Sequence, residues 1–361
     1  MIDESHNSAK IIAFYLPQFH PIPENDEWWG KGFTEWTNVR KAKKLFLGHY
    51  QPHIPAELGY YDLRLPAARK AQADMARAYG IGGFCYWHYW FGNGKRLLEK
   101  PFNEVLDSGE PDFPFCLGWA NETWSGIWHG NPGKILIEQT YPGKTDYINH
   151  FNAILTSLLD PRYIRVDDKP LFVIYRPFSL PHPEEFIALW QDLARQNGLK
   201  GFFFAGISNH IAEEKELLKK YGFDAVIPNR LESAIKALTS LPLRIFRKML
   251  QRPAVFSYKS LVPFLSGAED QHEDVFPVVL PNWDNSPRSG KRALIVKNAK
   301  PEYFKQHLSQ ILEKIEQKPA ARKLIFLKSW NEWAEGNYVE PDVVFGKAYL
   351  EVIKACVELE N

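Results

Sequence analysis

The sequence contains few cysteines and no long apolar run. Cys85, Cys116 and Cys356 are its only cysteines, too few for a disulfide framework, so the composition fits a reducing compartment. No apolar stretch approaches the roughly 20 residues that a helix needs to span a bilayer. The first ten residues are polar and acidic, whereas a signal peptide begins with a basic stretch followed by an apolar one. We therefore expect a cytoplasmic protein without a transmembrane segment.

An excess of charge of either sign is also missing. The chain has 44 Lys and Arg against 43 Asp and Glu, which gives a formal net charge of +1. A nucleic-acid-binding protein needs a clustered excess of basic residues for its phosphate contacts, so the charge balance argues against that class. Because 45% of the residues are hydrophobic and 24% are charged, the composition is that of a folded globular protein.

Several motifs of known chemistry are absent. The sequence has no nucleotide-binding P-loop, no dinucleotide-binding glycine pattern, no nucleophile elbow and no pair of histidines at metal-ligand spacing on a helix. No strand end carries the Asp-x-Asp pair that a metal-dependent sugar-nucleotide transferase usually needs. We therefore assign no cofactor and no metal ion.

Short apolar segments alternate with helical patterns along the chain. Nearly continuous apolar runs are typical of parallel strands covered on both faces. Eight of them, each followed by a helical pattern, predict a single-domain (β/α)8 barrel over residues 1–361. A doubly wound open sheet is the alternative, and it fits less well without a glycine-rich phosphate turn. The predicted strands are Ile11–Leu16, Ile81–Trp87, Phe115–Ala120, Leu171–Tyr175, Phe202–Ile207, Ala225–Pro228, Phe276–Leu280 and Leu324–Ser329.

Five helical segments have recognisable ends. Asp62–Tyr79 stops before Gly80, and Pro183–Asn197 opens on a proline and stops before Gly198, as helices commonly do. The other predicted helices are Thr145–Leu159, Glu302–Glu316 and Gly346–Leu359. A (β/α)8 barrel takes about 250 residues, so the remainder forms insertions. We place the largest at about 17–59, 121–143 and 229–274.

Aromatic residues are abundant, and the tryptophans follow predicted strands. Of the 12 Trp, eleven lie at strand ends or in the loop after the first strand, which holds Trp28, Trp29 and Trp36. Only Trp190 falls in a predicted helix. A (β/α)8 barrel builds its active site at the carboxyl ends of the strands. The aromatic residues therefore gather where a substrate is expected.

Polar residues accompany these rings. Any single tryptophan there is more readily explained as core, but aromatic faces beside amide and carboxylate groups together suit sugar rings. We therefore expect an oligosaccharide or polysaccharide substrate. His20 and His88 either contact it or orient a neighbour. The candidate substrate-binding residues are Tyr15, His20, Glu35, Trp36, Trp87, His88, Trp119, Asn121, Trp124, Tyr175, Trp283, Asn285, Arg288, Trp330 and Asn331.

Glu332 and Glu335 are the candidate catalytic residues. They follow the last predicted strand and are three residues apart, which places both on one side of a helical turn. Two carboxylates with different pKa values can supply the acid and the base that glycosidic chemistry needs. The neighbouring Trp330 and Trp333 would exclude water and raise one of the two pKa values. Alternatively, one glutamate caps the turn and the other pairs with an arginine at the rim.

Two more glutamates are weaker candidates. Glu35 lies in a loop flanked by tryptophans and either hydrogen-bonds a sugar or holds Arg40. Glu340 follows the strand-8 pair and is a candidate for the rim of the site.

The segment 230–260 differs from the rest of the chain. It contains seven basic residues and one acidic residue, and leucines, isoleucine and methionine recur at roughly helical spacing. Such a segment is a candidate for peripheral contact with an anionic membrane or for binding a phosphorylated acceptor. The favoured alternative is a helix packed on the barrel with a solvated basic face.

Taken together, several motifs resemble the WbsX family. The resemblance covers nearly the whole chain, in the order Tyr15–His20, Gly32–Asn38, Tyr86–Trp90, Trp119–Trp124 and Trp330–Gly336. That family is usually described as glycosyltransferases of surface polysaccharide (lipopolysaccharide O-antigen) biosynthesis, and also as similar to glycoside hydrolase family 99. The likeness to family 99 itself, the endo-α-mannosidases, is narrower and consists of the barrel and the last motif.

The likeness to family 99 implies roles for the two glutamates. It implies that Glu332 acts as a base on the 2-hydroxyl of the sugar, which attacks the anomeric carbon to form a 1,2-anhydro sugar. It further implies that Glu335 protonates the leaving oxygen and then activates water, with retention of configuration. Ala334 stands where those hydrolases often have His.

Three functions remain from the sequence. The first is a retaining enzyme acting on an α-linked, mannose-like glycoside, as a hydrolase or a transglycosylase. The second is a cytoplasmic glycosyltransferase of polysaccharide assembly, as the family description implies. The third is a non-catalytic carbohydrate-binding barrel.

Overall fold

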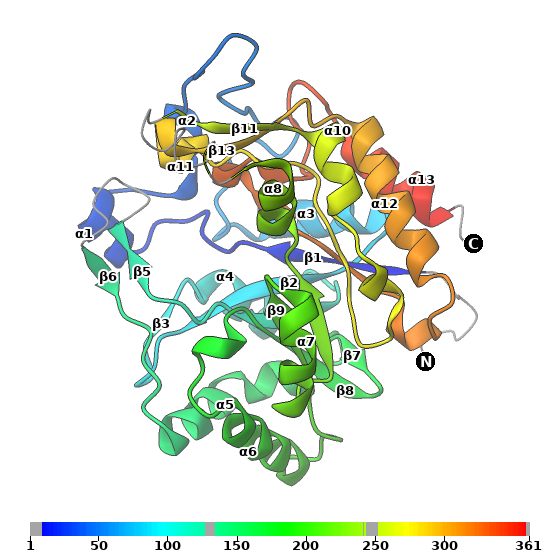
Figure 1. Cartoon of the computed structure of the whole chain (residues 1–361). Helices are drawn as coiled ribbons and strands as arrows, with labels where there is room; N and C mark the ends of the chain where they lie inside the picture. Colours follow the sequence, from blue (N-terminus) through cyan, green and yellow to red (C-terminus); the bar gives the residue numbers. More distant parts are fainter. Residues whose placement is uncertain (1–8, 127–133, 241, 243–251, 359–361) are drawn as a thin grey trace.

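Eight parallel strands form the centre of the computed structural model, which describes residues 9–126, 134–240, 242 and 252–358. Their order around the barrel is β10-β9-β8-β4-β2-β1-β14-β12. In Figure 1 the barrel lies on its side, with α1, α2 and α11 gathered at the left. The strands are β1 Lys10–Tyr15, β2 Ile81–Trp90, β4 Phe115–Trp119, β8 Lys169–Ile174, β9 Phe203–Ser208, β10 Ala225–Pro228, β12 Val278–Val279 and β14 Leu324–Leu327.

The barrel is nearly closed where β10 and β12, the two ends of this strand order, approach each other. Val226 of β10 forms a parallel bridge with Val275, just before β12. The Val226 amide donates to the carbonyl of Asp274 at 2.8 Å, and the Phe276 amide donates to the carbonyl of Val226 at 2.9 Å. This confirms the predicted (β/α)8 barrel and excludes the open sheet. The seventh predicted strand is shorter than expected, because Pro277 and Pro281 on its flanks carry no N–H for a ladder.

Helices follow the strands, as the sequence predicts. The helix expected over 62–79 begins only at Pro66, since Asp62 instead binds the guanidinium of Arg64. It ends before Gly80, whose φ of +84° is the left-handed conformation of a helix stop. The longer helices are α3 Pro66–Ala78, α4 Lys100–Ser108, α5 Lys144–Leu159, α6 Pro183–Gln196, α7 Ile211–Lys220, α8 Leu231–Leu238, α12 Pro301–Ile315 and α13 Ala348–Glu358.

Short elements fill the loops. Trp28, Trp29 and Trp36, expected in a loop, lie in the short helices α1 and α2, which corrects the prediction that only Trp190 is helical. The short helices are α1 Pro23–Trp29, α2 Glu35–Lys41, α10 Tyr258–Leu261, α11 Ser286–Ser289 and the 3-10 turns η2 Pro177–Ser179, η3 Val262–Phe264, η4 Ala268–Gln271, η5 Gly290–Arg292, η6 Ala320–Arg322 and η7 Trp333–Glu335. The short strands are β3 Arg96–Leu97, β5 Trp124–Ser125, β6 Ile135–Ile137, β7 Arg165–Val166, β11 Ala254–Ser257, β13 Leu294–Lys297, β15 Asn331–Glu332 and β16 Asn337–Tyr338.

Aromatic rings fill the barrel interior. Phe14 of β1 stacks on Trp87 of β2 with ring centroids 4.6 Å apart, and on Phe326 of β14 at 5.0 Å. Part of the tryptophan content therefore serves as core. Beyond the carboxyl ends of the strands lies the face that we call the mouth, formed by the loops after β1, β4, β10, β12 and β14.

The insertion after β10 packs beside the mouth. Its strand β11 pairs in parallel with β13, which comes from the loop after β12. Residues 241 and 243–251, the centre of the basic segment, lie outside the described residues. At its edges Arg230 pairs with Asp270 at 2.7 Å and Lys236 pairs with Glu232 at 2.7 Å. Membrane contact through 230–260 stays a prediction, as does the single domain.

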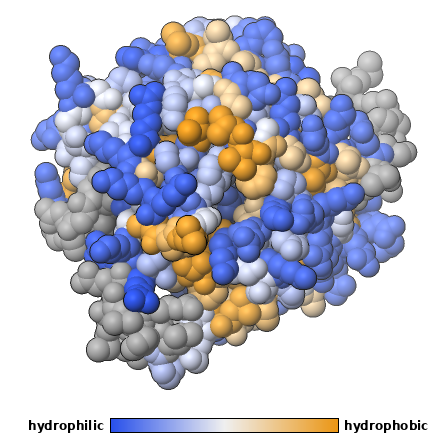
Figure 2. All heavy atoms as spheres, turned by 90° about the horizontal axis from the view of Figure 1, so that it is seen from above, coloured by the Kyte–Doolittle hydropathy of each residue, from blue (hydrophilic) through white to orange (hydrophobic). Residues whose placement is uncertain are grey.

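The surface is mixed. Figure 2 shows a largely hydrophilic face with hydrophobic groups scattered in a broken band. Exposed apolar side chains include Ile54 and Val343, whose backbones are joined by a hydrogen bond of 3.0 Å. Throughout the part of the chain that the structure describes, every helix is too short or too polar to cross a bilayer.

Candidate functional site

One guanidinium at the mouth binds three carboxylates. Arg288 lies 2.9 Å from Glu35, 2.8 Å from Glu332 and 3.0 Å from Glu335. We call these four residues the Arg288 cluster. Their side chains are 10–16% exposed, so they lie at the bottom of the mouth and still reach solvent. Three carboxylates around one guanidinium give the cluster a net charge of two negative charges when all four groups are ionised.

Three separate loops supply the cluster. Glu35 is the first residue of α2, after β1, and Arg288 lies in α11, after β12. Glu332 ends β15, and Glu335 ends the 3-10 turn η7, after β14. Glu332 directly precedes η7 and Glu335 is its last residue, so the single turn between them brings both carboxylates to the same guanidinium. Arg40, the alternative partner of Glu35, lies over the ring of Tyr60 instead.

Asp284 holds the Arg288 loop in place. Its carboxylate accepts hydrogen bonds from Gln51 at 2.7 Å and from the Ser286 amide at 2.9 Å, and contacts His49 at 2.7 Å. Its own amide donates to the carbonyl of Glu335 at 2.6 Å. Burial raises the pKa of Asp284, but the hydrogen bonds that its carboxylate forms with His49, Gln51 and Ser286 outweigh burial and keep this pKa below its usual value. The loops after β1, β12 and β14 are thus tied together behind the cluster.

Gly336 makes this close approach feasible. Its φ of +57° is a left-handed conformation, and a Cβ at this position would lie 2.9 Å from the Cβ of Asp284. Any larger residue would push the two loops apart. The glycine of the last motif therefore sets the spacing between Glu335 and the Arg288 loop.

The environment of the cluster shifts two of its pKa values. Burial raises the pKa of Glu332 well above its usual value, and the charges of Glu335 and Glu35 raise it further, whereas Arg288 opposes the shift. The pKa of Arg288 rises despite its burial because of the three carboxylates. Both shifts favour the charged form of Arg288 and the protonated form of Glu332.

Lys328 is a charged neighbour that sequence reasoning missed. It directly follows β14, and its ammonium donates to Asn229 at 3.3 Å. Burial lowers its pKa, while the charges of Glu335 and Glu332 raise it. The sequence does contain a signal for it, since Lys328 is a charged residue inside the apolar run Leu324–Ser329. Side chains alternate along a strand, so Lys328 shares the inward face of Phe326.

Glu340 is not at the rim, which corrects the prediction from the sequence. It is 2% exposed. Its carboxylate accepts hydrogen bonds from the indoles of Trp330 at 2.8 Å and Trp333 at 2.6 Å, from Gln72 at 2.6 Å and from Tyr61 at 2.8 Å. We call these five residues the Glu340 network. Burial raises the pKa of Glu340 to about 7 although all four donors oppose the shift.

Several candidate residues lie behind the mouth rather than in it. Tyr15 donates to Gln72 at 2.7 Å and so extends the Glu340 network. His88 faces the helix α5, where it contacts His150 at 2.8 Å, and burial lowers the pKa of both imidazoles. Trp119 is 1% exposed and donates to the carbonyl of Trp90. Adjacent strand residues point to opposite faces, so Trp87 and His88 cannot both face the interior.

Two asparagines at strand ends have matching structural roles. The Asn331 side chain accepts from the Leu16 amide at 2.8 Å and donates to the Leu16 carbonyl at 3.1 Å. The Asn121 side chain accepts from the Arg176 amide at 2.7 Å and donates to the Arg176 carbonyl at 2.9 Å. Each asparagine thus continues the pairing of two neighbouring strands, and each is followed by a glutamate.

The remaining candidates are partly exposed or support loops. Trp87 and Tyr175 meet edge to face inside the mouth at 5.5 Å. Trp124 packs against Tyr89 at 5.0 Å. Asn285 accepts a hydrogen bond from the Leu294 amide at 2.8 Å and so ties the Arg288 loop to β13. Three further candidates are His20, which is buried with a lowered pKa, Trp283, which is partly buried, and Trp36, which is 5% exposed and packs on Trp333.

The described ranges contain no group of three His, Cys, Asp or Glu side chains placed to hold a metal ion. The three acids of the cluster surround a guanidinium instead. The site therefore offers three carboxyl groups, which can act as acids or bases, around one guanidinium and next to aromatic rings.

Comparison with known proteins agrees with this architecture. The chain resembles the Bacteroides thetaiotaomicron GH99 endo-alpha-mannosidase in complex with BIS-TRIS-Propane, with a TM-score of 0.61 and 16% identity over 97% of both chains. It also resembles a structure described as a glycoside hydrolase-like protein, with a TM-score of 0.60 and 14% identity over 99% of this chain and 96% of that one. At these identities the likeness establishes the barrel fold alone.

Sequence comparison is more specific. The chain is 38% identical over 356 residues to the uncharacterized protein WxcX of Xanthomonas campestris pv. campestris strain B100 and of strain ATCC 33913. The match covers 96% of this chain and 49% of each relative, so the chain spans about half the length of these curated relatives. The model of the family Glycosyltransferase WbsX matches residues 11–353. The chain therefore belongs to the WbsX glycosyltransferase family.

Proposed function

We propose that this protein is a carbohydrate-active enzyme that breaks or transfers an α-linked, mannose-like glycosidic bond through Glu332 and Glu335. The observation that carries the proposal is that both carboxylates lie together at the carboxyl end of β14 and stay 13% and 16% exposed, although each pairs with Arg288, at 2.8 and 3.0 Å. Acid–base chemistry at a glycosidic oxygen needs two such groups in different protonation states. The family membership and the barrel shared with an endo-alpha-mannosidase support the substrate class.

The cluster favours unequal protonation. Three carboxylates cannot all be ionised at low cost beside a single guanidinium, and burial raises the pKa of Glu332 well above its usual value. We therefore propose that the proton of the cluster rests on Glu332, with the Arg288 guanidinium 2.8 Å away. The roles implied by family 99 place the acid at Glu335, so in that mechanism the proton has to pass from one carboxyl to the other when the sugar binds.

The walls of the mouth fit a sugar ring. Trp87 and Tyr175 present aromatic surface, and Glu35 offers a further carboxylate oxygen for hydroxyl groups. Arg288 already binds that oxygen, so a sugar hydroxyl would share it or replace the guanidinium.

Transfer to a saccharide acceptor is the second candidate function. The description of the family as glycosyltransferases favours it. The same two glutamates would serve both reactions, with an acceptor hydroxyl in place of water.

The experiment compares wild-type protein with Glu332→Gln and Glu335→Gln. Aryl α-mannosides and α-1,2-linked manno-oligosaccharides test hydrolysis, and GDP-mannose or UDP-sugars with an oligosaccharide acceptor test transfer. Glu122→Gln is the matched control, because Glu122 also follows a strand-end asparagine but pairs with Arg176 at 3.0 Å. We expect sugar release that both cluster variants lose and the control keeps. Nucleotide release would favour transfer, and binding without turnover would favour a carbohydrate-binding barrel.

A further inference from the structure

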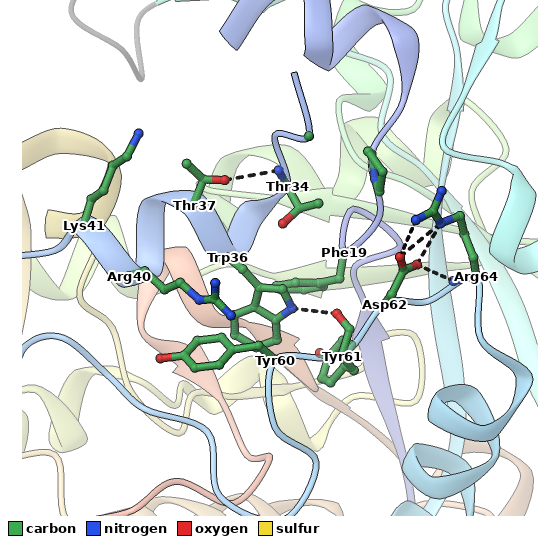
Figure 3. Close-up of a pocket in the computed structure, with 12 residues that line it drawn as sticks. Phe19, Thr34, Trp36, Thr37, Arg40, Lys41, Tyr60, Tyr61, Asp62 and Arg64 are labelled. Carbon is green, nitrogen blue, oxygen red and sulfur yellow. Dashed lines mark hydrogen bonds and ion pairs between the residues drawn. The ribbon is translucent and has the colours of Figure 1, made fainter. Parts of the chain in front are cut away.

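A cavity of about 460 Å³ lies beside α2. Its wall is formed by α2, by the loop Tyr60–Arg64 and by residues that follow β1, as Figure 3 shows. Its volume is within the range of about 300–1,000 Å³ typical of small-molecule sites. None of its lining residues is Glu332, Glu335 or Arg288. We call it the α2 cavity.

Aromatic rings form the floor of the α2 cavity. Trp36 and Tyr60 meet edge to face at 5.1 Å. The Trp36 indole donates to the carbonyl of Tyr61 at 2.8 Å, which fixes its ring, whereas Tyr60 is 37% exposed. The guanidinium of Arg40 lies 4.0 Å from the centroid of the Tyr60 ring (Figure 3). One face of Tyr60 is therefore covered, which leaves no room for a nucleobase to stack between the two.

The rim of the α2 cavity is basic. Arg40, Lys41 and Arg64 line it together with a single acid, Asp62. Asp62 is bound by Arg64 at 2.6 Å. Within the described ranges, neither Arg40 nor Lys41 forms an ion pair with an acidic side chain. Arg40 and Lys41 thus line the cavity without an acidic partner, near the hydroxyl groups of Thr34 and Thr37. Arg40 lies over the Tyr60 ring, whereas Lys41 points away from that ring at the edge of the cavity (Figure 3).

We propose that the α2 cavity binds an acidic sugar unit, with its carboxylate or phosphate at Arg40 and Lys41 and its ring against Tyr60 and Trp36. Threonine hydroxyls and the Asp62 carboxylate are suitable partners for sugar hydroxyls, and paired cations are suitable partners for a carboxylate or a phosphate.

The inference rests on the proposed function, since the cavity would hold a unit of the glycan outside the reacting bond. Trp36 follows Glu35 on α2 and packs on Trp333 at 5.5 Å. Trp333 lies between the two candidate catalytic glutamates in the sequence. A sugar in the α2 cavity would therefore position the helix that carries Glu35.

The test is isothermal titration of tetragalacturonate, mannose 6-phosphate and neutral mannotetraose into wild type and two double variants. Arg40→Gln with Lys41→Gln removes both unpaired cations. Lys43→Gln with Lys44→Gln is the matched control, because it removes two exposed charges from the same segment outside the cavity. We expect the first double variant to raise the Kd of the acidic sugar at least tenfold and the control to change it less than twofold. The acidic sugar that binds more tightly identifies the anionic group.

Other results would overturn the inference. One is that neither acidic sugar binds up to millimolar concentration, and another is that mannotetraose binds as tightly as the acidic sugars. The inference also fails if both double variants lose the same affinity, or if UDP or GDP binds more tightly than the acidic sugar in competition. Tyr60→Ser provides a second variant, and we expect it to weaken binding about tenfold without changing the net charge.

A variant carrying both Glu332→Gln and Glu335→Gln separates the two proposals. If it keeps the acidic-sugar affinity and loses turnover, both proposals stand. If it keeps turnover, the proposed function fails while the binding result is unaffected. If it loses the affinity, the ligand occupies the mouth and the α2 cavity is not its site.

Discussion

The Arg288 cluster and the Glu340 network both contain carboxyl groups, and Glu335 of the cluster lies only a few residues before Glu340 in the sequence. The two carboxyl groups differ in their exposure and in the charge of their partners. In the cluster, three acids share one cation and remain 10–16% exposed. In the network, one acid accepts four hydrogen bonds from uncharged donors and is 2% exposed. In the Arg288 cluster one guanidinium does not neutralise three carboxyl groups, whereas in the Glu340 network both carboxyl oxygens accept hydrogen bonds.

This difference separates a carboxylate available for chemistry from one that holds the structure. A reacting carboxylate must exchange its partners for substrate groups, which requires access and an uncompensated charge. A carboxylate held by four rigid donors loses those hydrogen bonds if it moves, and each bond to a charged group contributes about 1.5–3 kcal/mol. The Glu340 network therefore supports the tryptophans beneath the cluster and has no part in the mechanism that we propose.

The sharpest test of this contrast is turnover. Glu332→Gln or Glu335→Gln is expected to lower the rate of sugar release about 10²–10⁴-fold, because general acid–base groups contribute about that much. Glu340→Gln, assayed well below its unfolding temperature, is expected to stay within tenfold of wild type. Initial rates on an aryl α-mannoside measure all three. A loss in Glu340→Gln as large as in the cluster variants would remove the distinction between the centres.

Removing the shared cation is expected to cost stability. Arg288→Met leaves the partly buried acids of the cluster without their cation, which is expected to lower the free energy of unfolding by about 3–5 kcal/mol at pH 7.5. Urea unfolding at pH 7.5 measures the effect.

The control for this variant is Arg64→Met. Arg64 pairs with Asp62 at 2.6 Å but is 44% exposed, so its loss is expected to cost about 1 kcal/mol or less. Equal costs in the two arginine variants would mean that the cluster is no more strongly coupled than a surface ion pair.

Replacing the buried acid by its amide tests the network. Glu340→Gln keeps the shape, but its NH2 group brings two donors to the indole N–H groups, where the protonated carboxyl of Glu340 at pH 5 brings one. At pH 5 we expect a loss of about 3 kcal/mol in the free energy of unfolding, since buried donors are left without acceptors. Urea unfolding with fluorescence detection measures it. A variant as stable as wild type at pH 5 would contradict the role given to the four hydrogen bonds.

The sequence predicts the barrel because parallel strands covered on both faces must be apolar throughout. It overestimates the seventh strand, where prolines on the flanks of Val278–Val279 remove ladder donors. The sequence analysis misses α1 and α2, although Pro23 in the first turn of α1 and Thr34 at the N-cap of α2 are typical starts of helices. In the structure the Thr34 amide donates to the Thr37 hydroxyl.

The candidate site is predictable in part. The two glutamates, Glu35 and Arg288 follow from motifs at strand ends, but their grouping depends on how three loops pack. Glu340 lies inside the protein because β15 and β16 form an antiparallel hairpin that pairs Glu332 with Asn337 and returns the chain beneath Trp330. Spacing along the sequence carries no information on such a reversal, so it could not separate Glu340 from the candidate pair Glu332 and Glu335.

The smallest expected effect is the pH dependence of the network. The pKa of Glu340 is raised to about 7, so between its ordinary value near 4.5 and pH 7 the folded protein retains a proton that the unfolded chain releases. A folded state that binds more protons loses stability as the pH rises. From pH 5 to pH 7, Glu340 is therefore expected to lower the free energy of unfolding of the wild type by about 2 kcal/mol. Glu340→Gln lacks this titration, so its stability deficit should narrow by the same amount over this range. A deficit that is constant with pH would mean that Glu340 ionises in the folded protein as it does in the unfolded chain, and that its four donors fully offset its burial.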